Sequence, residues 1–94
     1  MLRASNAYAK QLDVELNQTY RELMAKLGAP AAQKLRAAQR GWLSFMTTEA
    51  AFIDGTWNAQ DFGSASALSR SEYRNSLTKA RIVQLLGYLR AYPE

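Results

Sequence analysis

The chain contains neither cysteine nor histidine among its 94 residues. Without cysteine, no disulfide can stabilise the fold and no thiolate is available as a nucleophile or metal ligand. Without histidine, the chain lacks the side chain that most often acts as a general base and as a transition-metal ligand. These absences argue against an enzyme, and we expect no catalytic residues, no metal site and no cofactor.

Long apolar runs are also missing. No stretch approaches the roughly eighteen apolar residues that a membrane-spanning helix needs. The first six residues lack the apolar centre of a secretory signal peptide, although a mature secreted chain would look the same after its signal was removed. A chain of this length is the size of one domain, and its apolar residues, mostly Ala and Leu, favour helices.

Residues 5–27 have the pattern of an amphipathic helix. Apolar side chains recur at three- and four-residue steps, at Ala9, Leu12, Leu16, Tyr20 or Thr19, Leu23 and Leu27. Gly28 follows as a C′ glycine would, and Pro30 suits the first turn of another helix. The sequence therefore predicts a tight corner and a second helix antiparallel to the first.

The second helix is predicted over residues 30–53 and ends at the Asp54-Gly55 turn. Its expected inward stripe is Leu35, Ala38, Trp42, Phe45, Glu49 and Phe52, widened by Met46 and Ile53. Gly41 lies in the middle of this helix and is interpreted as a surface glycine.

Residues 56–67 are rich in Gly, Ser, Asn and Asp, and predict an irregular loop with room for one short helical turn. Ser69 and Glu72 then fit a capping box, which predicts a third helix over residues 70–92. Its expected inward residues are Tyr73, Leu77, Ala80, Leu85 or Leu86, and Leu89. The chain is thus predicted to be all-α, with three main helices as an antiparallel array, one long loop and a single domain over residues 1–94.

Charge is distributed unevenly along the chain. Residues 1–47 hold seven basic and three acidic groups, and residues 70–94 hold five and two. The intervening segment has three acids and no basic residue, and it also carries Trp57 and Phe62, which have no periodic reason for burial. These aromatic side chains either cap helix ends or contact a partner. The partner-binding candidates are Glu49, Asp54, Trp57, Asp61 and Phe62.

The net charge of +4 raises the question of nucleic acid. Nucleic-acid-binding proteins usually concentrate basic residues on one face, whereas here they are dispersed among all three predicted helices and interrupted by acids. A solvated surface is the favoured interpretation, and nucleic acid is not the expected partner. The alternative hypothesis for the function is a basic protein that binds nucleic acid or an anionic envelope surface. A third hypothesis is a weak cell-wall hydrolase.

Three blocks of sequence resemble, in order and spacing, the N-terminal domain family of LprI-type lysozyme inhibitors. Residues 13–20 resemble A-D-x-x-L-N-x-x-Y, residues 38–45 resemble A-Q-R-A-W-I-x-F, and residues 77–89 resemble L-T-x-x-R-x-x-x-L. The motif residues, interpreted as structural, are Asn17, Tyr20, Gln39, Arg40, Trp42, Phe45, Thr78 and Arg81.

This resemblance implies a non-enzymatic bacterial protein, secreted or periplasmic, that binds another macromolecule, with a lysozyme as the candidate protein partner. The chain departs from the family at Met46-Thr47, where Arg-Asp is usual, and at the positions of family cysteines, which here are Ala4, Ala50 and Tyr73. Many lysozymes are strongly basic and would repel a chain of net positive charge. Contact is therefore expected at the acidic segment. The sequence leaves the oligomeric state open.

Overall fold

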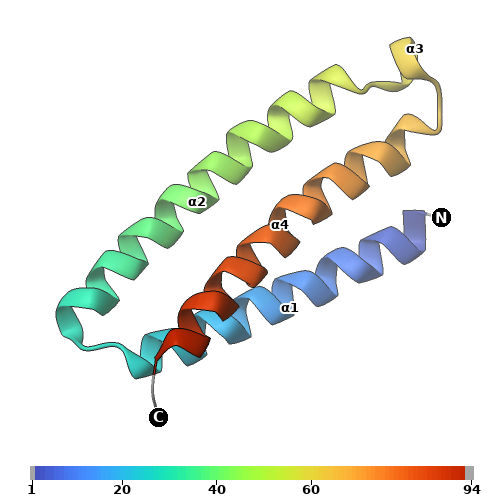
Figure 1. Cartoon of the computed structure of the whole chain (residues 1–94). Coiled ribbons are helices and arrows are strands. Elements are labelled where there is room, and N and C mark those ends of the chain that lie inside the picture. Colours follow the sequence, from blue (N-terminus) through green and yellow to red (C-terminus); the bar gives the residue numbers. More distant parts are fainter. Residues whose placement is uncertain (1, 93–94) are drawn as a thin grey trace.

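The computed structural model describes residues 2–92, with side chains from residue 6 onward. These residues form four helices and no strand: α1 (Leu2–Lys26), α2 (Ala29–Thr56), α3 (Ala59–Phe62) and α4 (Ser66–Ala91) (Figure 1). The predicted all-α array of three main helices is confirmed, and α3 is the short helical turn for which the loop had room. The side chain of Ala4 lies outside the described part of the chain.

The three long helices lie lengthwise and alternate in direction, so that α1 and α4 run the same way and α2 runs against both (Figure 1). The described structure measures 50 × 23 × 16 Å along its principal axes. Helix α4 packs along α1, and its packing on α2 is sparser. Helix α3 lies at the far end of the molecule, beside the start of α4.

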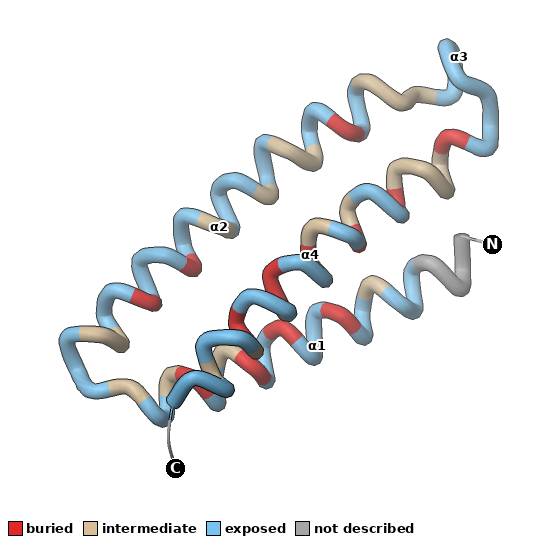
Figure 2. The backbone as a smooth tube through the Cα atoms, viewed as in Figure 1, coloured by how far each residue is buried: buried red, intermediate tan, exposed pale blue. Residues whose placement is uncertain are grey.

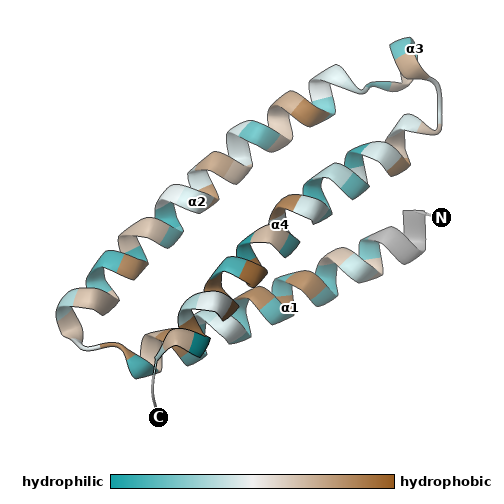
Figure 3. Ribbon diagram, in the orientation of Figure 1, coloured by the Kyte–Doolittle hydropathy of each residue, from teal (hydrophilic) through white to brown (hydrophobic). Residues whose placement is uncertain are grey.

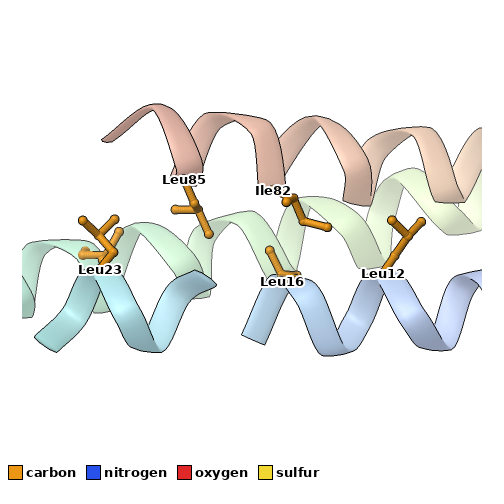
Figure 4. Packing of buried hydrophobic residues seen from close by; sticks show 6 residues of the cluster. Leu12, Leu16, Leu23, Ile82 and Leu85 are labelled. Carbon is orange, nitrogen blue, oxygen red and sulfur yellow. The ribbon is translucent and has the colours of Figure 1, made fainter. Parts of the chain in front are cut away.

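The hydrophobic core lies mainly between α1 and α4. Its buried members are Leu12, Leu16, Leu23, Leu35, Ile82 and Leu85 (Figure 4). Figure 2 shows buried residues along the facing sides of α1 and α4. The predicted stripe of α1 is confirmed, and of its two alternatives Thr19 is buried while Tyr20 is half-buried. Each fully buried leucine stabilises the fold by about 1.5–3 kcal/mol relative to an exposed one.

The inward face of α2 differs from the predicted one. Its buried residues are Leu35, Gln39 and Ile53. Three residues predicted to face inward are exposed instead: Ala38, Phe45 and Phe52. With 100° of turn per residue, the observed inward face of α2 lies about 60° around the helix axis from the predicted one. The observed face includes Gln39, whose Oε1 accepts a hydrogen bond from Arg81 Nε at 3.0 Å in the interior.

Small polar residues occupy much of the inward face of α4. Its buried residues are Ser66, Ser71, Asn75, Thr78, Arg81, Ile82 and Leu85. Two residues predicted to point inward, Tyr73 and Ala80, are exposed. Thr78 can be buried because its Oγ1 donates to the Arg74 carbonyl at 3.4 Å. No fully buried side-chain nitrogen or oxygen of the described residues lacks a hydrogen-bond partner.

The helix ends also differ in detail from the prediction. Helix α4 begins at Ser66, so Ser69 lies inside the helix and the predicted capping box does not start it. Gly63 makes the turn before it with φ +85°, a left-handed conformation that favours glycine. Gly28 has φ −73° and is the N-cap of α2 rather than a left-handed C′ residue, while a proline occupies the first turn of α2 as predicted.

Polar and apolar residues alternate around each long helix (Figure 3). Within residues 2–92, none of the helices combines the length and the apolar character that crossing a membrane requires.

Candidate functional site

The five predicted partner-binding residues lie at the end of the molecule where α2, α3 and α4 meet (Figure 1). Glu49 and Asp54 belong to the last turns of α2, Trp57 follows that helix, and Asp61 and Phe62 form the end of α3. We call this region, residues 49–62 together with residues 70–77 of α4, the acidic–aromatic end.

Trp57 is the centre of an aromatic cluster. Its ring meets Phe52 edge-on, with centroids 5.5 Å apart, and meets Tyr73 edge-on at 5.0 Å. Arg70 Nη1 donates to the Trp57 carbonyl at 2.6 Å, which joins the end of α2 to the start of α4. Trp57 therefore packs over a helix end and is half-buried. Phe62 is different, since 57% of it is exposed.

A depression of about 380 Å³ opens beside Trp57. It is lined by Glu49, Phe52, Ile53, Trp57, Tyr73, Ser76 and Leu77. Glu49 forms no ion pair with any described residue, so its charge is available to a ligand. Aromatic rings attract cations through their electron-rich faces, and a carboxylate adds a charged acceptor. The pocket is thus suited to a lysine or arginine side chain.

The other two acids predicted to bind a partner, Asp54 and Asp61, already have partners within the chain. Asp54 forms an ion pair with Arg74 of α4, and Asp61 Oδ2 accepts a hydrogen bond from Asn58 Nδ2 at 3.2 Å. Arg70 and Arg74 bring positive charge to a segment that carries only acids in the sequence. With these two arginines, the acidic–aromatic end is less negative than residues 49–62 alone would make it. Among the residues with described positions, no three acidic side chains gather as metal ligands.

Sequence reasoning missed five members of this pocket: Phe52, Ile53, Tyr73, Ser76 and Leu77. The aromatic pair Phe52 and Tyr73 was missed because both residues were expected in the core. Phe52 lies outside the core because the inward face of α2 contains Gln39 and differs from the predicted face. Tyr73 lies outside the core because polar residues occupy much of the inward face of α4. A buried glutamine in an apolar stripe gives no separate signal in the sequence. Trp57 in a polar segment was the one visible sign of the cluster.

The family-motif residues fall into two groups. The buried or half-buried members are Tyr20, Gln39, Trp42, Thr78 and Arg81. Tyr20 and Trp42 pack against the core, and Gln39 is hydrogen-bonded to Arg81. The exposed members are Asn17, Arg40 and Phe45. Packing thus accounts for the first group and gives no reason for the second.

The family model described as lysozyme inhibitor LprI matches residues 1–85, which include the whole acidic–aromatic end. No curated protein and no solved structure matches the chain.

Proposed function

Because the chain belongs to the lysozyme inhibitor LprI family, we propose that it is a non-enzymatic bacterial protein, secreted or periplasmic, that binds and inhibits a lysozyme. The observation that carries the proposal is the family match over residues 1–85, since the family is named for inhibition rather than for catalysis. The acidic–aromatic end supplies the chemistry for a basic partner.

In this proposal a lysine or arginine on the lysozyme surface enters the pocket beside Trp57. Its charge pairs with Glu49, and its aliphatic stem packs on Phe52 and Tyr73. Aromatic anchors in partly desolvated pockets commonly carry most of the energy of a protein interface. Asp61 and Phe62 on the neighbouring helix α3 extend the contact surface around the pocket.

The net charge of +4 opposes the approach of a basic partner, so contact depends on local rather than overall complementarity. The Asp54–Arg74 pair neutralises one acid and leaves Glu49 as the acid that lies in the pocket. Inhibition requires only that the bound chain obstruct access of the glycan substrate to the lysozyme cleft. No catalytic group of this chain takes part.

Calorimetric titration against a panel of lysozymes tests the proposal. The parent chain binds at least one member, and Glu49→Gln weakens that binding by about tenfold, because a buried charge-assisted contact is lost. Trp57→Ala weakens it further. Glu15→Gln is the matched control, since Glu15 is exposed on α1 outside the acidic–aromatic end, and its affinity stays that of the parent.

Two results would overturn the proposal at different levels. Absence of binding by the parent to every lysozyme would exclude a lysozyme as partner. If Glu49→Gln, Trp57→Ala and Asp61→Ala all bind lysozyme with the affinity of the parent, the acidic–aromatic end is excluded as the contact site. Lysozyme would still be the partner.

A further inference from the structure

A second groove lies between α1 and α2, apart from the acidic–aromatic end. Its volume is about 220 Å³, and it is lined by Leu16, Asn17, Tyr20, Arg36, Arg40 and Leu43. Gln39 forms part of the same surface, with its oxygen already bound to Arg81. Two of the exposed family-motif residues, Asn17 and Arg40, therefore meet in one place.

Neither arginine of this groove has a hydrogen-bond or ion-pair partner within the described part of the chain. Arg36 and Arg40 are exposed, lie one helical turn apart, and make no hydrogen bond or ion pair with a described residue. In contrast, the guanidinium groups of Arg70, Arg74 and Arg81 are each bound to an oxygen. Like charges at this spacing repel each other on a helix. An anion held between Arg36 and Arg40 would relieve that repulsion.

The remaining walls of the groove define what kind of anion fits. Leu16 and Leu43 are apolar, and the half-buried Tyr20 ring faces the same space. Asn17 also lines the groove, and its side-chain amide is a hydrogen-bond donor. Asp13, one turn before Asn17 on α1, forms no ion pair with either arginine. The groove thus offers hydrogen-bond donors for an oxyanion beside an apolar surface.

We propose that this groove binds a carboxylate attached to a small apolar group, such as the free end of a peptide whose last residue is apolar. Guanidinium groups present pairs of donors that match the two oxygens of a carboxylate. The apolar part lies against Leu16, Leu43 and the Tyr20 ring, as in other small-ligand sites. Phosphate carries more charge on a smaller ion and leaves these apolar walls uncovered. The proposal is independent of lysozyme binding.

The test is a titration of the full chain with N-acetyl-leucine, followed by its backbone amide NMR signals at about 0.15 M salt, which screens diffuse attraction to a basic protein. Saturable shifts are expected at residues 16–20 and 36–43. The neutral N-acetyl-leucinamide should produce none of them. Arg40→Gln should weaken binding by about tenfold, the loss of one charge-assisted contact.

Lys34→Gln is the matched control, because it removes the same charge from an exposed position on another side of α2. It should bind N-acetyl-leucine as the parent does. Equal binding of the acid and the amide, or undiminished binding in the Arg36→Gln, Arg40→Gln double variant, would overturn the site. Inorganic phosphate binding as tightly as N-acetyl-leucine would overturn the assigned ligand. All three substituted residues are exposed, so the variants should fold, and circular dichroism verifies this.

Discussion

The Gln39–Arg81 hydrogen bond has consequences well beyond its two residues. Both side chains are 8% exposed, and Arg81 Nε lies 3.0 Å from Gln39 Oε1. Arg81 Nη1 also donates to Gln84 Oε1 at 2.7 Å. Burying a guanidinium is costly unless its N–H groups find acceptors. Because Gln39 is the acceptor that α2 provides, this bond sets which face of α2 meets α4.

Replacing Gln39 with leucine is therefore expected to lower the free energy of unfolding by about 1–3 kcal/mol, since Arg81 Nε loses its acceptor inside the protein. Urea unfolding followed by circular dichroism measures the change. Gln33→Leu is the control, because Gln33 is exposed on the same helix, and its effect should stay within about 0.5 kcal/mol. A neutral Gln39→Leu variant would contradict this role of the bond.

Two glycines should respond oppositely to the same substitution. Gly41 is an exposed helical residue, and an added Cβ there meets nothing within 4 Å. Gly41→Ala should raise the free energy of unfolding by about 0.5–1 kcal/mol through helix propensity and reduced freedom of the unfolded chain. Gly63 has φ +85°, so Gly63→Ala should lower it by about 1–3 kcal/mol. Thermal unfolding of both variants measures the change in the free energy of unfolding. Changes of the same sign at Gly41 and Gly63 would contradict the opposite effects expected from their backbone conformations.

At the scale of helices, the core is shared unequally. The buried cluster takes Leu12, Leu16 and Leu23 from α1, Ile82 and Leu85 from α4, and only Leu35 from α2. Most of the stabilising burial therefore joins α1 to α4. Helix α2 is held by fewer apolar contacts and by polar links such as Gln39–Arg81.

Hydrogen exchange should reveal this difference. Amides that are slow to exchange report the regions of highest local stability. We expect the slowest amides in α1 and α4, near Leu16 and Leu85, and faster exchange along the middle of α2. Amide exchange followed by NMR at fixed pH and temperature measures the rates. Finding the slowest amides in α2 would show that the helices share the core differently.

The same helices show how far the sequence predicts the structure. The α1 stripe is readable because Leu12, Leu16 and Leu23 are apolar at helical spacing. The stripes of α2 and α4 were misjudged because polar residues, Gln39 and Thr78 among them, occupy inward positions. A pattern of apolar residues does not reveal a polar pair formed 42 residues apart in the chain.

The candidate site could be predicted only in part, because it too depends on contacts between residues far apart in the chain. Glu49 and Trp57 were identified from charge and from an aromatic residue in a polar segment, and they do line one pocket. The engagement of Asp54 by Arg74 was not foreseen, because it depends on how the start of α4 lies against the end of α2. Tertiary packing, rather than local sequence, decides which acids are available to a partner.

On the scale of the whole molecule, the two proposed surfaces have opposite preferences. The acidic–aromatic end, at one extreme of the 50 Å long structure, suits a cationic side chain. The groove between α1 and α2 suits a carboxylate. Because different residues line the two sites, variants of one should leave ligand binding at the other unchanged.

The proposed lysozyme contact lies at the acidic–aromatic end of the molecule. The most direct test follows the backbone amide NMR signals of the chain during titration with an unlabelled basic lysozyme. We expect shifts or broadening at residues 49–62 and 70–77, with residues 16–20 and 36–43 unaffected. Perturbation centred on the groove between α1 and α2, or no perturbation at saturating lysozyme, would contradict it.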